Sequence, residues 1–263
     1  IIKNKYFWII SLASWIGFLE GAQGNIIAWL YNYGHLCTSN QFTLIILLYS
    51  NASLWGMLAA PFAIRKWGKR NVLICTNLLN ILFIAMMYPI VQNIWLVLIC
   101  VWLNFMVGAF EVVLKPNLNA DIRDYQQYVT GERIDGMFLA ISVIGNIITL
   151  ITSGVLPIVY EKFGVVDGNG YENMYEILDV NNNPTVLYSL VHAIIILSVV
   201  GAFLNILPYF FYDLSEKKQE AIIKVLRVRA VFEDYGNNAL KDRELVQAVD
   251  IVNESKELYN KEH

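Results

Sequence analysis

Several side chains that can ionise or form strong hydrogen bonds lie inside long apolar stretches of the sequence. Glu20 is followed three residues later by Gln23, and Asn104, Glu111 and Lys115 follow one another at helical spacing. A carboxylate at membrane depth can bind a cation, carry a proton or accept hydrogen bonds from a polar ligand. Glu20, Gln23, Asn104 and Glu111 are therefore candidates to line a substrate or ion path.

Each acid also has a structural interpretation. Glu20 could be a protonated carboxyl group bonded to a neighbouring helix, although its place near the middle of an apolar stretch favours function. The flanking glycines, Gly21 and Gly24, are expected to loosen the helix there. Glu111 could instead serve an ion pair with Lys115, whose long stem could also reach the membrane interface. The sequence leaves both interpretations of Glu111 open.

A second polar stripe carries no charge. Ser142, Asn146 and Thr149 recur at helical spacing within one apolar stretch. Such a stripe can line an aqueous path or join neighbouring helices, and the second role is commoner for Ser and Thr. Asn146 is the strongest candidate of the three.

Motifs for catalysis are missing from the sequence. It has no HExxH, no glycine-rich phosphate loop and no nucleophile elbow. The cysteines Cys37, Cys75 and Cys100 lack the spacing of a metal site or a disulfide framework. We expect neither an enzyme nor a cofactor or metal, and nothing indicates a nucleic-acid partner.

The composition explains what must position these residues. Hydrophobic residues make up 57% of the chain and charged residues only 16%, against about a quarter charged in soluble domains. About half of the charged residues lie after Tyr212. This distribution predicts a domain in the lipid bilayer, residues 1–212, followed by a charged tail, residues 213–263.

The apolar stretches are long enough to cross a membrane. A helix needs about 20 residues to cross about 30 Å of hydrocarbon, and it satisfies its own backbone hydrogen bonds in lipid. We expect an all-α bundle of six transmembrane helices and a helix in the tail. The spans are expected near residues 6–30, 42–64, 71–89, 94–116, 136–160 and 185–212.

The basic residues indicate the orientation. Lysines precede the first expected span, and Arg65, Lys66, Lys69 and Arg70 fill the second connection. The positive-inside rule then places both termini in the cytoplasm. We expect a multi-pass protein of the plasma membrane.

Two connections resemble a known family. Arg65, Lys66, Gly68, Lys69 and Arg70 are similar to the cytoplasmic loop motif of the major facilitator superfamily. A second segment is more specific, because it resembles the loop between helices ten and eleven of the glycoside-pentoside-hexuronide:cation symporters, the melibiose-permease-like family. The residues that carry this second resemblance include Asp121, Asp124, Tyr125 and Arg133.

The resemblance implies a fold and a function. It maps the chain onto the carboxyl-terminal six helices of a twelve-helix transporter, with an amino-terminal half as partner. It also implies a sugar-like solute in a central cavity, coupled to Na⁺ or H⁺. Glu20 and Glu111 would lie on cavity-lining helices. The sequence departs from the family at one position. The family often carries a lysine in helix eleven, whereas this sequence has Ile147 at the corresponding position.

The function expected from the sequence is half of a secondary active transporter that takes up a sugar or glycoside by alternating access. One alternative is a carrier of a lipid-like or other amphipathic solute. Another is a membrane subunit or channel of six helices that does not transport by alternating access.

Overall fold

The computed structural model describes residues 4–133, 136, 143–148, 150, 154–165, 175–237 and 242–262. Throughout these residues the regular structure is helical. The elements in chain order are α1 (Lys5–Ile16), η1 (Phe18–Asn25), α2 (Ile26–Asn32), α3 (Ser39–Ser50), α4 (Ala52–Trp67), α5 (Lys69–Met87), η2 (Tyr88–Ile90), α6 (Ile94–Thr130), α8 (Val155–Lys162), α10 (Val186–Ile206), η3 (Leu207–Phe211), α11 (Glu216–Gly236) and α12 (Asp242–Glu262).

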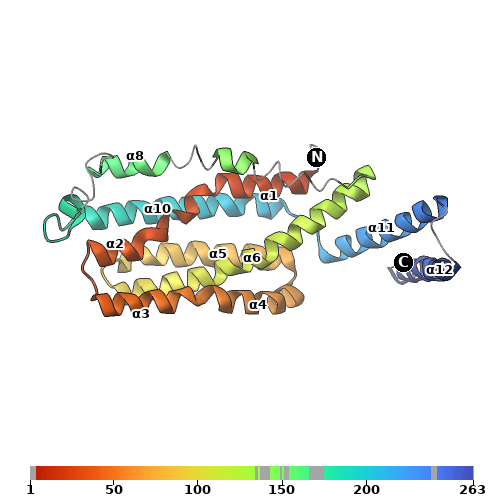
Figure 1. Cartoon of the computed structure of the whole chain (residues 1–263), viewed down its shortest axis with the longest axis horizontal. Coiled ribbons are helices and arrows are strands. Elements are labelled where there is room, and N and C mark those ends of the chain that lie inside the picture. Colours follow the sequence, from red (N-terminus) through yellow and green to blue (C-terminus); the bar gives the residue numbers. More distant parts are fainter. Residues whose placement is uncertain are drawn as a thin grey trace.

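The longer helices run side by side along the long axis of the molecule (Figure 1). The consecutive helices α3 and α4 pack beside α6, while α10 packs against η1 and α5. Helix α6 continues past one end of the bundle, where α11 lies against it and α12 follows. This end is called the α11 end below. The α2–α3 connection lies at the opposite end (Figure 1).

Polar side chains define where several helices begin. The Asn4 side chain accepts hydrogen bonds from the first turn of α1, and Asn93 does the same for α6. Thr38 and Gln41 form a reciprocal capping box at the start of α3. Ser215 caps α11 by accepting from the backbone N–H of Lys218, and serine is among the residues preferred at this position.

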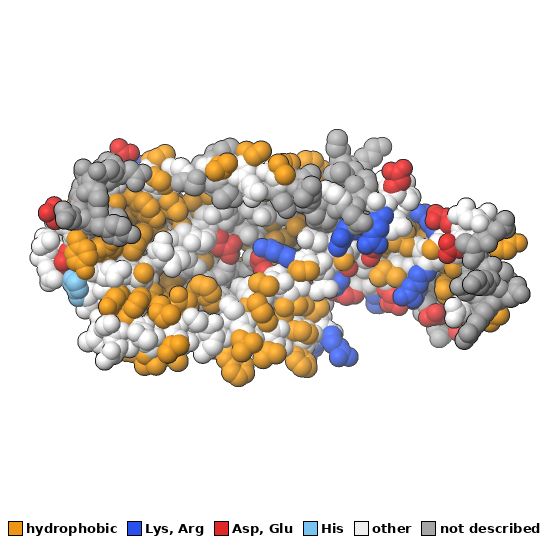
Figure 2. Space-filling model, viewed as in Figure 1, with side chains coloured by type: hydrophobic (Ala, Val, Ile, Leu, Met, Phe, Trp, Pro, Cys, Tyr) orange, Lys and Arg blue, Asp and Glu red, His pale blue; other side chains and the backbone are white. Residues whose placement is uncertain are grey.

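The surface of the bundle is apolar. Side chains such as Leu47, Phe62 and Phe203 are more than half exposed, and Figure 2 shows hydrophobic side chains over much of the bundle. Lys and Arg gather toward the α11 end in the same view. An apolar surface of this extent is unsuited to water and suits contact with lipid.

Four helical segments among the described residues are long and apolar enough to cross a membrane. They are Ser39–Trp67, Lys69–Ile90, Ile94–Thr130 and Val186–Phe211. The structure is therefore that of an all-α, multi-pass membrane protein. The first expected span, 6–30, is divided into α1, η1 and α2, and the fifth, 136–160, lies partly outside the described residues. Six spans remain a prediction.

Helix α6 differs most from the sequence-based expectation. It does not end near residue 116 but continues to Thr130, so the segment predicted as a connecting loop is helical up to that residue. Pro116 lacks only one backbone donor, and its helix tolerates that loss. The extension is held by burial of Ile122 and by the Asn4 side chain, which donates to Gln126 at 3.1 Å.

Candidate functional site

A cavity of about 500 Å³ lies within the bundle, in the range of small-molecule sites. Its wall comes from η1, α2, α3, α4, α5 and α6, so segments far apart in the sequence contribute to it. The lining residues are Gly17, Glu20, Gly21, Gln23, Gly24, Ile27, Ala28, Ile46, Tyr49, Ser53, Thr76, Asn77, Asn80, Val101, Asn104, Phe105, Val107, Gly108, Ala109, Glu111 and Val112.

A chain of amide side chains leads to Glu20. The Gln23 side chain donates to Asn104 Oδ1 at 3.0 Å, Asn104 donates to Asn80, and Asn80 donates to the Glu20 carboxylate. The Asn205 side chain is a further hydrogen-bond partner of Glu20. These hydrogen bonds fix the position of the Glu20 carboxylate in the cavity wall.

The backbone around Glu20 explains how this acid reaches the cavity. Residues Phe18–Asn25 form η1, a 3₁₀ segment that interrupts the first apolar stretch, as the glycines there predict. Helix α10 packs directly on this segment at Gly201. The approach is so close that a Cβ at Gly201 would overlap the backbone nitrogen of Glu20. Close backbone contact thus holds the irregular segment in place.

Glu111 also lines the cavity, on α6, whereas Glu20 belongs to η1. Its carboxylate forms an ion pair with Lys115 Nζ at 2.6 Å, and the Glu111 side chain is only 16% exposed against 47% for Lys115. The ion pair expected from the four-residue spacing is therefore present. Glu111 lines the cavity at the same time, so its two interpretations are compatible.

The rest of the wall offers apolar contacts. The rings of Tyr49 and Phe105 lie 5.5 Å apart, on α3 and α6. Aromatic faces beside polar groups can hold a ring that has both apolar and hydroxyl-bearing surfaces. Ser53 adds a hydroxyl from α4.

The second polar stripe consists of Ser142, Asn146 and Thr149, and only Asn146 lies in the part of the chain that the structure describes. Asn146 is exposed and does not line the cavity. Ser142 and Thr149 lie outside the described residues. The uncharged stripe remains untested as a solute path.

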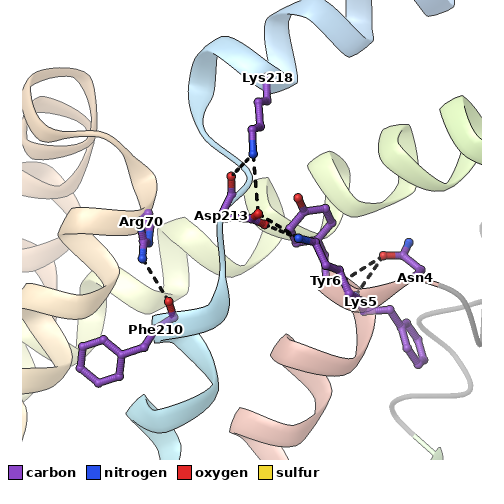
Figure 3. A network of polar contacts seen from close by, with 8 residues as sticks. Asn4, Lys5, Tyr6, Arg70, Phe210, Asp213 and Lys218 are labelled. Carbon is purple, nitrogen blue, oxygen red and sulfur yellow. Dashed lines mark hydrogen bonds and ion pairs between the residues drawn. The ribbon is translucent and has the colours of Figure 1, made fainter.

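The basic loop motif joins the bundle to α11. Gly68 takes a positive φ of 80°, a conformation that glycine adopts readily. The next residue, Lys69, donates its backbone N–H to the Glu216 carboxylate and places its Nζ 2.5 Å from Asp121 Oδ2. Arg70 donates to the Phe210 carbonyl oxygen at 3.0 Å (Figure 3).

The other motif residues divide between the same junction and the surface. Asp124 accepts from Gln219 of α11 at 3.1 Å, and the Tyr125 ring packs edge-on against Tyr6 at 4.7 Å. Arg65 and Lys66 are exposed at the end of α4, and Arg133 is exposed just after α6. The motif therefore serves the α11 end rather than the cavity.

Asp213 connects the first turn of α1 with the first turn of α11 at this junction. Its carboxylate lies 2.7 Å from Lys5 Nζ and 3.6 Å from Lys218 Nζ (Figure 3). The hydrogen bond from Lys5 is the main cause that lowers the pKa of Asp213 to about 2.

Asn80 and Asn205 are two further candidates for the site, and the sequence alone did not indicate them. Asn80 and Asn205 are 7% and 6% exposed, and both contact Glu20. An amide inside a membrane-spanning stretch is the signal that could have found them. The tryptophans Trp15, Trp55 and Trp102 do not line the cavity.

An apolar helical bundle around a cavity lined by carboxylates and amides is an arrangement suited to a membrane transporter. Comparison with known proteins agrees: the chain belongs to the MFS/sugar transport protein family, whose profile matches residues 1–216. This assignment also excludes an enzyme.

A curated relative comes from Bacillus subtilis (strain 168), where it is described as the uncharacterized symporter YnaJ. The chain is 26% identical to it over 186 residues, which cover 67% of this chain and 37% of the relative. The chain thus spans little more than a third of the relative's length.

Proposed function

We propose that this chain forms the carboxyl-terminal half of a secondary active transporter that takes up a sugar or glycoside together with Na⁺ or H⁺. The observation that carries the proposal is the cavity in which the amide chain and Glu20 face an aromatic wall. Hydroxyl groups of a sugar would bond to the amides and carboxylates, and its apolar ring face would pack on Tyr49 or Phe105.

The transport cycle would be alternating access at this cavity. The six-span bundle would rock against an amino-terminal six-helix half, with the solute near the midplane. Hydrogen bonds join α11 to α6 and to the loop at Gly68. The α11 end would therefore move as one unit in such a motion. The basic residues support a cytoplasmic position for that end in the plasma membrane.

Uptake by cells that express the full-length transporter tests this function. A panel of radiolabelled monosaccharides and disaccharides is offered with and without Na⁺, and with and without a protonophore. We expect saturable uptake of at least one sugar that depends on one of the two ions. Uptake of amphipathic solutes alone would contradict the sugar assignment, and flux indifferent to both ions would contradict coupling.

A further inference from the structure

The second apolar span, Ser39–Trp67, is interrupted in its middle, at Asn51. Helix α3 ends at Ser50 and α4 begins at Ala52, and the two helices follow one another along the bundle (Figure 1). Neither glycine nor proline stands at the interruption. The Ser50 hydroxyl donates to the Ile46 carbonyl oxygen at 2.6 Å, and a bond of this kind competes with the backbone ladder and bends helices. The sequence of the span therefore favours a break at this place.

The interruption lies beside the cavity. Ile46 and Tyr49 line the cavity from α3, just before Asn51, and Ser53 lines it from α4, just after Asn51. A rotation of α3 about Asn51 would therefore move Ile46 and Tyr49 but leave Ser53 in place. The shape of the cavity depends on the angle between the two helices.

The two helices are attached to α6 to different extents. Helix α4 buries Ala52, Gly56 and Ala60. At Gly56 the helices approach so closely that an added Cβ would overlap the Met106 carbonyl oxygen of α6. In α3, by contrast, Ile45 is the one buried residue. Close packing fixes α4 on α6, which leaves α3 as the part of this span that can move.

A hydrogen bond joins the interruption to α6. The Trp102 indole N–H donates to Asn51 Oδ1 at 3.2 Å. One turn further along α6, the Phe105 ring lies beside that of Tyr49. An amide at membrane depth needs a partner in the protein, because lipid offers none. Trp102 itself does not line the cavity, so any effect it has on a solute passes through Asn51.

We propose that Asn51 is a hinge of α3 and that Trp102 is the positioning residue that holds this hinge. The bond between them keeps Ile46 and Tyr49 in the cavity wall. When the bond opens, α3 swings away from α6 and opens the cavity toward the α2–α3 connection, the end of the bundle opposite α11. This inference rests on the proposed function and deepens it, because it assigns the opening of the cavity on that side to one helix.

The reactivity of single cysteines tests the hinge without any solute. Ile46→Cys and Ser53→Cys are introduced separately into the full-length protein without other cysteines, and each purified protein reacts in detergent with a methanethiosulfonate reagent. Both positions are half-buried in the cavity wall. Only Ile46 lies on the moving side of Asn51, so the two rates distinguish a swing of α3 from a general loosening of the bundle.

Trp102→Phe removes the indole donor and keeps an aromatic ring. We expect this change to raise the rate of modification at Ile46→Cys about 3- to 20-fold, the shift in population that loss of one hydrogen bond between membrane helices produces. The rate at Ser53→Cys should not change, because α4 stays packed on α6.

The matched control is Trp55→Phe on α4. The Trp55 side chain is 55% exposed, does not line the cavity and forms no hydrogen bond with a described residue. This change should leave the rate at Ile46→Cys at its parental value. An equal rise with Trp55→Phe would overturn the role of the Trp102 hydrogen bond.

The remaining outcomes separate the hinge from the proposed function. A faster reaction at Ser53→Cys, alone or together with Ile46→Cys, would mean that α4 moves, and unchanged rates at both positions would mean that the bond does not hold α3. Either result overturns the hinge, and sugar uptake by the parent would still stand. A rise at Ile46→Cys alone, in a protein that takes up no sugar, would support the hinge and refute the solute assignment.

Discussion

Glu20 is the carboxylate on which the amide side chains of the cavity converge. Its role in transport can be separated from a role in folding. Glu20→Gln keeps the size of the side chain and an acceptor for Asn80 but removes the charge. Since hydrogen bonds to a charged group contribute about 1.5–3 kcal/mol, the initial rate of uptake should fall at least about tenfold.

The measurement compares uptake by the full-length variant with its abundance in the membrane, which should stay within about twofold of the parent. The control is Asn117→Ala, since Asn117 is exposed and its amide donates to the Val113 carbonyl oxygen of its own helix. Uptake at the parental rate by Glu20→Gln would mean that Glu20 is a structural hydrogen-bonding group.

The Glu111–Lys115 pair calls for a double-mutant cycle. Lys115→Ala leaves the nearly buried Glu111 without its positive partner, whereas Glu111→Gln leaves Lys115, which is 47% exposed, able to reach water. Lys115→Ala should therefore destabilise more, and the double variant should recover about 0.5–3 kcal/mol relative to additivity. Thermal unfolding in detergent gives all four corners, and strict additivity would refute the coupling.

At the scale of elements, close contact between α4 and α6 depends on one glycine. A Cβ at Gly56 would overlap the Met106 carbonyl oxygen and lie 2.8 Å from Ala109 Cβ. Gly56→Ala should destabilise the bundle by about 1–3 kcal/mol, because backbone must move to admit the methyl group. Thermal unfolding measures the loss.

The control is Gly108→Ala on α6, where an added Cβ meets nothing within 4 Å. That change should be neutral or stabilising by up to about 1 kcal/mol, since alanine favours helix more than glycine does. Equal losses for the two variants would show that helix propensity, and not close packing, decides the result.

The attachment of α11 should depend on pH through Asp213. Its pKa is lowered to about 2 from an ordinary value of 3.8, chiefly by the hydrogen bond from Lys5. A lowered pKa means that ionised Asp213 stabilises the folded junction above about pH 4, and that this contribution is lost as the pH falls toward 2. The side chain is 46% exposed, so the effect is modest.

Hydrogen exchange over residues 213–236 checks this expectation. Asp213→Asn should exchange faster than the parent at pH 6, while the two proteins should converge as the pH falls toward 2. A constant difference between them across this range would show that the charge of Asp213 does not hold α11.

The orientation of the whole molecule follows from its distribution of basic residues. If the positive-inside rule holds, the α11 end faces the cytoplasm and the segment after α8 faces outward. In a full-length background without cysteines, an impermeant thiol reagent applied to intact cells should label Asn182→Cys but not Lys217→Cys. Both positions are exposed. The reverse labelling pattern would refute the topology.

The sequence by itself determined the class of protein and the first candidates for its site. Long apolar stretches and a charged tail are local properties of the chain, and lipid leaves helices as the way to satisfy the backbone there. Glu20, Gln23, Asn104 and Glu111 could be chosen for the same reason, because a polar group at membrane depth is costly wherever it lies. The caps at Ser215 and the glycines of η1 also act locally.

Only the tertiary structure decided which residues meet. Asn80 and Asn205 joined Glu20 because α10 packs on η1 and α5 packs against α10, and no spacing along the chain specifies those contacts. The length of α6 was decided in the same way. Its last turns leave the apolar stretch, yet burial of Ile122 and the bonds from Asn4 and Gln219 keep them helical. Contacts between distant segments, unlike periodicity, are settled only when the helices pack.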